Sequence, residues 1–136
     1  MDWQECNMKK MVKSISADEE LLKSLLKTSE NKIISAELLV LNDTTANSKI
    51  SLAYDSLREL LEALALKNGF KIYNHECYTA FLKEILKESS LGDDFDEMRK
   101  LRNSINYYGE QVNKEECEKI IKQIKNIIQQ VKRKLK

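Results

Sequence analysis

The part of this chain best suited to chemistry is the segment 99–109, whose sequence is RKLRNSINYYG. On a helix, its polar side chains would lie three and four residues apart along one side: Arg99, Arg102, Asn103 and Asn106. A guanidinium group offers a fixed fork of N–H donors and stays charged at any working pH, which suits it to phosphate. The spacing therefore predicts a phosphate-binding strip, completed by the phenol of Tyr107.

The same strip has a plainer interpretation. Arginines on an exposed helix face commonly pair with a nearby acid, and Asp96 stands three residues before Arg99. Composition alone favours this second interpretation, so the phosphate hypothesis needs support from elsewhere in the chain.

Helices must position this strip, because the composition favours no other element. The 136 residues include no proline and only three glycines, and 33% of them are charged while 7% are aromatic. Such a chain has few helix breakers and few strand formers. Its periodic segments repeat at three and four residues, and none alternates. We therefore predict an all-α fold, an up-and-down bundle of four main helices with a short extra N-terminal helix.

One domain is expected to span residues 1–136, with the short helix in 1–15 and the bundle in 17–136. Capping residues and glycines indicate where the helices begin and end. In chain order, the predicted boundaries are a capping box at Ser16 and Glu19, a first long helix over 17–41, a helix end at Asn68-Gly69, a connector over 70–73, an N-cap at Asn74, a break at 89–92, a helix end at Gly109 and a last helix from about Asn113.

Charge and cysteine usage narrow the classes of protein. Lysine plus arginine (23) nearly balance aspartate plus glutamate (22), so nucleic-acid binding would need a local basic patch. Cys6, Cys77 and Cys117 are odd in number and lack CxxC spacing, which predicts neither a disulfide nor a zinc site, but reduced thiols. No apolar run approaches the roughly 20 residues needed to cross a bilayer. A cytoplasmic protein without membrane contact is expected.

The polar strip resembles the motif of the HEPN superfamily (higher eukaryotes and prokaryotes nucleotide-binding). That family has an arginine, usually followed by a polar residue, and then, after four to six intervening residues, a histidine on a late helix. Arg102-Asn103 matches the start of this motif, and the order of helices is similar over residues 17–136. His75 stands at the cap of the third helix, where many members also have a histidine.

The resemblance implies an RNA- or nucleotide-binding domain that forms a homodimer, with the motif arginine in a cleft between the subunits. Family members cleave RNA without metal or cofactor: the ribose 2′-hydroxyl attacks the adjacent phosphate, the histidine moves protons, and the arginine stabilises the charge that develops. Carried over, Arg102 is the phosphate clamp and Asn103 its polar neighbour. A nucleotidyltransferase antitoxin is the partner that the resemblance implies.

This chain departs from the family at the motif histidine, because positions 107–109 hold two tyrosines and a glycine. A tyrosine whose pKa is near 10 is a poor base at pH 7, and Asn106 exchanges no proton. The catalytic candidates are therefore Arg102, Tyr107 and His75, the only histidine of the chain. Capping or packing is the plainer role for His75.

Two further sets of residues have both a functional and a structural interpretation. Glu59 and Glu62 are weak catalytic candidates, and we expect them to be solvated carboxylates. Four tyrosines have rings that could stack on bases: Tyr73, Tyr78, Tyr107 and Tyr108. Tyr78 and Tyr108 fall on apolar stripes, however, and are better explained as core.

Two hypotheses about function follow. The first is a HEPN-like RNA- or nucleotide-binding homodimer, either a metal-independent ribonuclease of a toxin–antitoxin system or a relative that no longer cleaves. The alternative is a non-catalytic helical module that binds another protein through its isoleucine-rich last helix, 120–131. The same apolar stripe motivates the expectation of a homodimer.

Overall fold

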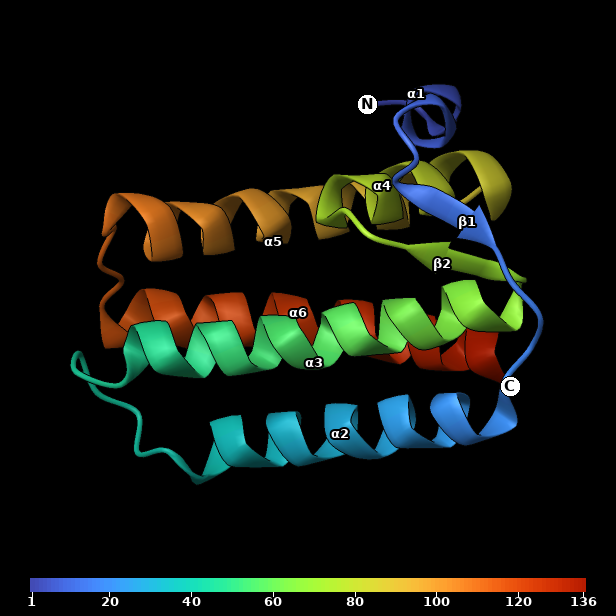
Figure 1. The fold of residues 1–136 in the computed structure, drawn as a ribbon. Helices are drawn as coiled ribbons and strands as arrows, with labels where there is room; N and C mark the ends of the chain where they lie inside the picture. The colour runs from blue at the N-terminus through green and yellow to red at the C-terminus, as the bar shows by residue number, and fades with distance from the viewer.

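Four long helices form the body of the molecule in the computed structural model, which describes residues 1–136 (Figure 1). They are α2 (Glu19–Leu38), α3 (Ala46–Lys67), α5 (Ser89–Tyr108) and α6 (Lys114–Leu135). Successive long helices run in opposite directions, and α3 and α6 lie between α2 and α5 in this view. The predicted all-α, up-and-down bundle of four main helices is confirmed.

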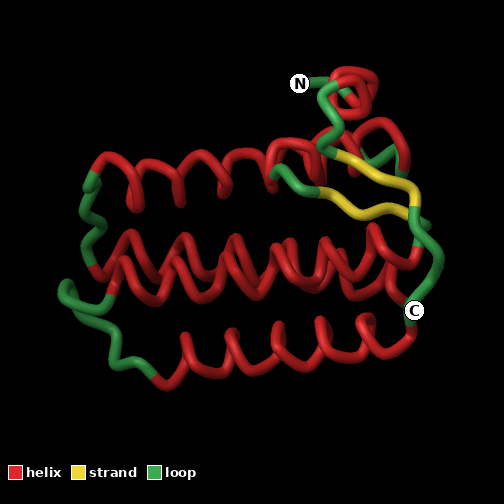
Figure 2. Tube along the Cα trace, in the orientation of Figure 1, coloured by secondary structure: helices red, strands yellow, loops and turns green.

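Five short elements gather at one end of the bundle: α1 (Trp3–Met8), β1 (Val12–Ser14), β2 (Phe70–Ile72), α4 (His75–Ala80) and the π-helical turn η1 (Phe81–Ile85). The two strands pair antiparallel, with Val12 opposite Ile72 and Ser14 opposite Phe70 (Figure 2). The prediction of helix alone in 1–15 and of a connector over 70–73 is therefore wrong at these residues. Three-residue strands have no periodicity to recognise, and they form only because the fold brings them together.

The first long helix begins later than predicted, because Asp18 rather than Ser16 is its N-cap. The backbone N–H of Leu21 donates to Asp18 Oδ1 at 3.0 Å. Just before it, the backbone N–H of Ile15 donates to the carbonyl of Gly69 at 2.9 Å, which continues the strand pairing. The chain is thus still extended where the capping box was expected.

The other capping predictions agree with the structure. The side chains of Asn74 and Asn113 accept from Glu76 N–H and Glu116 N–H at 2.8 and 2.9 Å. Gly109 ends α5 with a φ of 68°, in the left-handed region that glycine adopts without strain. These signals are local, so they could be recognised without knowing the fold.

The break after the third helix lies at residues 86–88 rather than at 89–92, which already belong to α5. Lys87 takes the left-handed conformation there, with a φ of 58°. Gly92 is needed for packing instead, because a Cβ on it would come within 2.4 Å of the Lys83 side chain. The absence of a side chain at Gly92 lets η1 and α5 approach closely.

The isoleucine-rich face of α6 packs inside the bundle. Ile124, Ile127, Ile128 and Val131 are all buried, with 0 to 3% of their surface exposed. Burying one such side chain contributes about 1.5 to 3 kcal/mol, so this seam is a major part of the core. It is therefore not available as the exposed docking stripe that the protein-interaction alternative requires.

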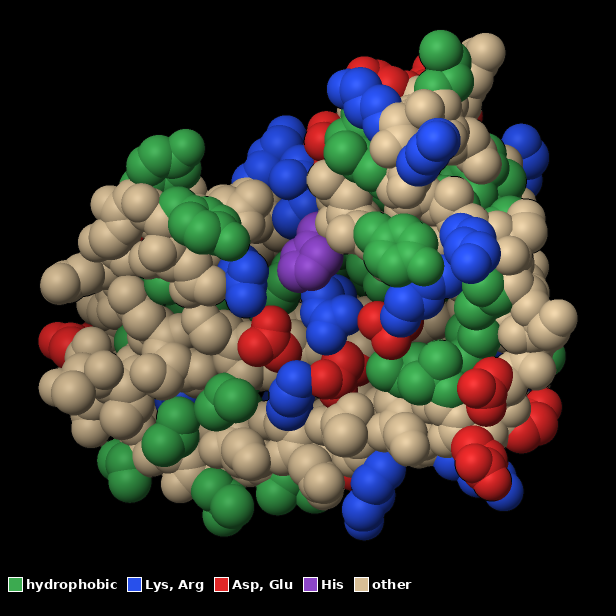
Figure 3. All heavy atoms as spheres, viewed as in Figure 1, with side chains coloured by type: hydrophobic (Ala, Val, Ile, Leu, Met, Phe, Trp, Pro, Cys, Tyr) green, Lys and Arg blue, Asp and Glu red, His purple; other side chains and the backbone are tan.

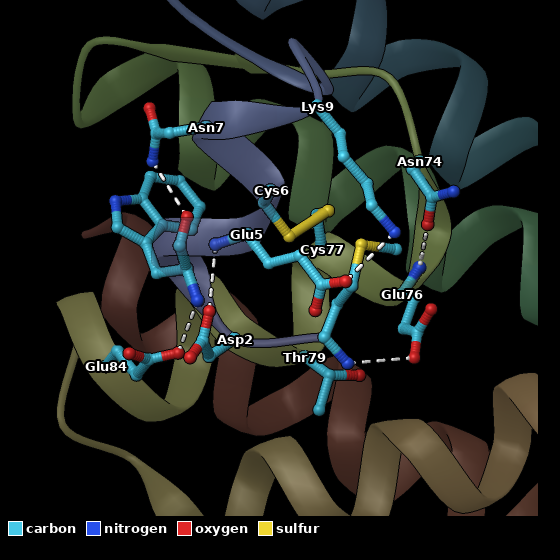
Figure 4. Close-up of a disulfide and its surroundings, with 12 residues drawn as sticks. Asp2, Glu5, Cys6, Asn7, Lys9, Asn74, Glu76, Cys77, Thr79 and Glu84 are labelled. Atoms are coloured by element: carbon cyan, nitrogen blue, oxygen red, sulfur yellow. Dashed lines mark hydrogen bonds and ion pairs between the residues drawn. A yellow bond between two sulfur atoms is a disulfide. The ribbon is translucent and has the colours of Figure 1, made fainter.

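A disulfide joins Cys6 of α1 to Cys77 of α4, two residues that are 71 apart in sequence (Figure 4). The prediction that these cysteines form no disulfide and stay reduced is wrong. The Trp3 ring packs against Phe70 and Phe81 at 5.2 and 6.0 Å between ring centroids, and these contacts pack α1 against β2 and η1. Cys117 is free and buried, and burial raises the pKa of its thiol.

None of the helices is both long enough and apolar enough to cross a bilayer.

Candidate functional site

A hollow of about 330 Å³ lies where the start of α4 meets the second half of α5, and we call it the α4–α5 hollow. Its lining residues are Tyr73, Asn74, His75, Glu76, Arg99, Arg102, Asn103 and Tyr107. Five of the residues predicted as site residues thus meet in one place, although His75 is far from the others in sequence. A recess of similar size between α5 and α6, about 390 Å³, contains none of them.

Asn106 does not line this hollow. It belongs to an adjoining shallow surface beside the start of α3, where Ser51 Oγ donates to Asn106 Oδ1 at 3.4 Å. Asn106 lies about one helical turn beyond Arg102 on the same side of α5, and this places it next to the start of α3 rather than the start of α4. The polar strip of α5 is therefore divided between two surfaces.

Arg102 is held between α5 and α3. Its Nη2 lies 3.5 Å from Asp55 Oδ1, and its guanidinium carbon lies 5.4 Å from the centroid of the Tyr54 ring. Its Nε is buried and has no hydrogen-bond acceptor. An unsatisfied buried donor costs about 1 to 3 kcal/mol, and because Nε has no accessible surface, a ligand in the hollow meets Arg102 only through its terminal nitrogens.

Arg99 has the partner that the plainer interpretation proposed. Its Nε donates to Asp96 Oδ1 at 2.8 Å, and Thr79 Oγ1 donates to the same oxygen at 3.0 Å. Burial opposes ionisation of Asp96, but the hydrogen bonds from Arg99 and Thr79 outweigh it and lower the pKa of that carboxyl. Pairing with Asp96 therefore explains Arg99, whereas Arg102 depends on a different acid from a different helix.

His75 is linked to the core through Tyr54, whose hydroxyl lies 3.1 Å from His75 Nδ1. Burial, followed by the positive charges of Arg58 and Arg102, lowers the pKa of His75 to about 4, so the ring is neutral at pH 7. Burial also raises the pKa of Tyr54, which keeps the proton on its phenol. Tyr54 is fully buried and His75 is its partner, so the phenol donates to Nδ1.

The tautomer of His75 follows from that hydrogen bond. A neutral imidazole carries one proton, and since Nδ1 accepts from Tyr54, we assign the proton to Nε2. His75 thereby offers an N–H donor. Protonating the ring would remove the acceptor of the buried Tyr54 hydroxyl, in agreement with the lowered pKa.

Glu59 and Glu62 are not the solvated carboxylates that were expected. Glu59 is 6% exposed and pairs with Lys32 and with Arg58, whose Nη2 is 3.8 Å away. Glu62 lies 3.3 Å from Arg58 Nη1 and 3.4 Å from Lys71 Nζ. Cations from α2, α3 and β2 converge on this part of α3, and this makes burial of the carboxylates tolerable.

The face in Figure 3 brings these features together around the purple side chain of His75, the only histidine of the chain. Basic and acidic side chains lie beside it, and hydrophobic side chains, a class that includes tyrosine in this figure, lie on both sides. The residues that sequence reasoning missed here are Tyr54, Asp55 and Arg58, all on α3. Their positions gave no signal, because their partners come from α4 and α5.

The exposure of the tyrosines separates two buried rings from three exposed ones and corrects one prediction. Tyr78 is buried as predicted, with 1% of its surface exposed. Tyr108 is 84% exposed, so the prediction that it belongs to the core is wrong. It lies in the last turn of α5, beyond the last buried residue of that helix, Ile105.

Fold and site together define a class: an all-α bundle with a basic hollow at the junction of two helices. Comparison with family models identifies the class further, since the model of the HEPN domain matches residues 22–134. The chain belongs to the HEPN family, which comprises nucleotide-binding and ribonuclease-like domains. The matched region includes every residue that lines the hollow. No curated protein matches the chain.

Proposed function

We propose that the protein is an RNA-binding HEPN domain that holds an RNA phosphate in the α4–α5 hollow. The observation that carries this proposal is that Arg102, Arg99, Asn103 and His75 line one hollow. Each of these groups donates hydrogen bonds, and a phosphate offers acceptors only. Arg102 is the phosphate clamp, and the others orient the backbone of the RNA.

The local electrostatics support an anionic ligand, although the chain as a whole carries a formal charge of only +1. After burial, the largest influences on the pKa of His75 are the positive charges of Arg58 and Arg102, with Asp55 opposing them. The guanidinium groups of Arg58, Arg102 and Arg99 all disfavour the charged form of His75, so this ring lies in a positive local field. That is the local patch that nucleic-acid binding requires in a nearly neutral protein.

Slow cleavage or none is part of the proposal. Transfer of a proton from the ribose hydroxyl needs a base whose pKa is near the working pH. His75 has a pKa of about 4 and its Nδ1 already accepts from Tyr54, while Tyr107 is 72% exposed with no side-chain hydrogen bond to activate it. The protein is then a relative of the ribonuclease toxins that binds RNA and cuts it poorly.

A homodimer and a nucleotidyltransferase antitoxin as partner belong to the same proposal, and family membership is the support for both. Members of the family commonly form dimers and bind RNA. The dimer is tested by light scattering at tens of micromolar, where a monomer mass would contradict it. The protein-interaction alternative has lost its main support, because the isoleucines of α6 are buried within the bundle.

The experiment is RNA binding by fluorescence anisotropy, with a labelled oligoribonucleotide at fixed salt. Arg102→Ala should weaken binding about 5- to 150-fold, the equivalent of about 1 to 3 kcal/mol for hydrogen bonds to a charged group. Arg133→Ala is the matched control, since Arg133 is exposed on α6 and forms no ion pair. Circular dichroism checks that both variants remain folded.

Two outcomes would overturn the proposal. One is that Arg102→Ala leaves binding unchanged, and the other is that Arg133→Ala weakens it equally. Cleavage is followed on gels with total RNA in the presence of a metal chelator. Rapid cleavage that persists in both His75→Ala and Tyr107→Phe would show that the catalytic part of the assignment is wrong.

A further inference from the structure

We propose that Tyr54, a buried residue of α3, is a positioning residue for the α4–α5 hollow, where it holds His75 as an N–H donor and supports the guanidinium of Arg102. This inference rests on the proposed function for the phosphate in the hollow. It deepens that function by naming the side chain that arranges two of the phosphate-binding groups. Tyr54 does not line the hollow itself, so it acts only through these two residues.

Tyr54 lies where α3 meets the two elements that form the hollow. Its hydroxyl is 3.1 Å from Nδ1 of His75 on α4, and its ring centroid is 5.4 Å from the guanidinium carbon of Arg102 on α5. The ring also stacks on Phe95 of α5, with 5.9 Å between centroids and 18° between the ring planes. One fully buried side chain therefore contacts a hollow-lining residue from each of the two helices.

The hydroxyl of Tyr54 decides which nitrogen of His75 carries the proton. The structure gives this hydroxyl one hydrogen-bond partner, Nδ1, and a buried phenol keeps its proton, so Nδ1 accepts and Nε2 carries the N–H. The ring reaches the surface, where it is the purple side chain in Figure 3. Without the hydroxyl, a neutral ring protonated at Nδ1 would leave Nε2 with a lone pair, which repels phosphate oxygens. Loss of the hydroxyl should therefore weaken RNA binding.

The ring of Tyr54 acts on Arg102. A guanidinium over an aromatic face is attracted to it, and the carboxylate of Asp55, the next residue of α3, holds the same group at 3.5 Å from Nη2. A long side chain that is already held loses less conformational entropy when it binds phosphate. Packing alone would require the ring of Tyr54 but not its hydroxyl, and the hydroxyl is the part that contacts His75.

The first test reads the proton of His75 directly. Because His75 is the only histidine, the imidazole nitrogen signals of protein without a histidine tag belong to it alone in NMR spectra. Tyr54→Phe removes the hydroxyl but keeps the ring face under Arg102. Tyr78→Phe is the matched control, since Tyr78 is also buried and its ring centroid is 6.3 Å from that of His75, but its hydroxyl makes no hydrogen bond to His75. Wild type and Tyr78→Phe should show the proton on Nε2, and Tyr54→Phe a mixture of both forms.

The second test measures RNA affinity by anisotropy at pH 7. Tyr54→Phe should bind about 2- to 10-fold more weakly than wild type, the scale of one hydrogen bond, and Tyr78→Phe should bind like wild type. Tyr54→Leu also removes the ring face, so it should lose about a further 2- to 5-fold. Circular dichroism and urea denaturation check that the variants are folded.

The pH dependence of binding distinguishes positioning from a role in stability alone. The hydroxyl bonds only to the neutral ring, so its removal should raise the pKa of His75. A protonated ring donates from both nitrogens, and the affinity of Tyr54→Phe should therefore recover toward that of wild type as the pH falls from 7 to 5.5. The other titratable and charged groups around the ring are unchanged in this comparison: Asp55 and Arg58 of α3, Glu76 and Tyr78 of α4, and Arg99 and Arg102 of α5.

The outcomes separate this inference from the proposed function. A proton on Nδ1 of His75 in wild type would overturn the inference whatever the variants do. Equal affinity and equal pH dependence of Tyr54→Phe and wild type would also overturn it, while a loss in Arg102→Ala would leave phosphate binding intact. An equal loss in Tyr78→Phe would mean that loosening of the core, and not the hydroxyl of Tyr54, weakens binding. If wild type bound no RNA, the proposed function would fail, and the NMR spectra would still decide whether Tyr54 fixes the proton of His75.

Discussion

Helix α3 contributes to two groups of charged side chains, and the two are built differently. One, the closed cluster, consists of Lys32, Arg58, Glu59, Glu62 and Lys71, which pair with one another. The other is the pair of Asp55 with Arg102 at the edge of the α4–α5 hollow. In the closed cluster each carboxylate has two cationic neighbours. In the hollow one carboxylate engages one of the five N–H donors of a guanidinium.

The difference indicates which buried charges serve stability and which serve binding. The charges of the closed cluster pair with one another inside the fold and line no hollow, although Glu59 Oε2 has no hydrogen-bond partner, and removing one charge leaves its partners uncompensated. Charges that keep free donors beside a solvent-filled hollow are costly to the fold but useful to a ligand. The same substitution, removal of one carboxylate charge, should therefore have opposite consequences in the two places.

The largest expected effect concerns the Cys6–Cys77 disulfide, which, like the closed cluster, serves stability rather than binding. Reduction of Cys6–Cys77 should lower the free energy of unfolding by about 4 kcal/mol, because the bond closes a loop across a separation of 71 residues. Urea denaturation with and without reductant measures the loss. Cys6→Ala is the control and should show no dependence on reductant. Equal urea midpoints for the oxidised and reduced wild type would contradict the stabilising role.

Within the closed cluster, Glu59→Gln should lower the free energy of unfolding by about 2 to 3 kcal/mol. Breaking a buried ion pair costs about 3 to 5 kcal/mol, and partial exposure of the Lys32 side chain, 36%, reduces that figure. Glu97→Gln is the matched control, since Glu97 is exposed and unpaired, and it should change stability by less than about 0.5 kcal/mol. RNA affinity should not change in either variant. A loss of affinity in Glu59→Gln at full folding would end the distinction between the two regions.

His75 gives a pH dependence whose sign can be worked out. Its pKa of about 4 in the folded protein lies below the ordinary value of about 6.5, so the unfolded chain binds more protons between those values. The stability that neutral His75 contributes is fully present above pH 6.5 and is lost as the pH falls toward 4. Because the ring is partly exposed, we expect a loss of about 1 to 2 kcal/mol rather than the full value of the shift.

The variant His75→Asn isolates that contribution. Asparagine places an amide oxygen near the position of Nδ1, so it keeps an acceptor for Tyr54 but does not titrate. Other groups, such as Asp96, contribute equally to both proteins. Denaturation midpoints from pH 7 to pH 4 should therefore fall more steeply in wild type than in His75→Asn. Parallel curves would mean that His75 does not titrate in this range.

Local signals explain what could be predicted from the sequence. Asn74, Gly109 and Asn113 act within one turn of their own helices, and the spacing of Arg99, Arg102 and Asn103 is a property of α5 alone. These features could be recognised without knowing how the helices pack.

Long-range partners explain what could not be predicted. The strand pair joins residues 12–14 to 70–72, and the disulfide joins Cys6 to Cys77. The partners of Arg102 and His75 are Asp55 and Tyr54 of α3, on neither of the two elements that form the hollow. No spacing rule connects these residues, because their proximity results from packing of the whole bundle.

The smallest expected effect is also the sharpest test of the comparison, because its sign is opposite to that of Glu59→Gln. Asp55 forms an ion pair with Arg102, with 3.5 Å between Asp55 Oδ1 and Arg102 Nη2, and its negative charge opposes the positive field that acts on His75. Asp55→Asn removes the negative charge that competes with phosphate but keeps the size of the side chain. Since a partly exposed pair contributes about 0.2 to 1 kcal/mol, RNA affinity should rise by roughly 1.5- to 5-fold. The free energy of unfolding should fall by no more than the same amount.

The control is Asp94→Asn, because Asp94 is an exposed acid near the start of α5 that does not line the hollow, and it reports the general effect of removing one negative charge. Anisotropy titrations at two salt concentrations measure both variants. Weaker RNA binding by Asp55→Asn would mean that Asp55 positions Arg102 rather than competing for it, and the hollow would then resemble the closed cluster after all.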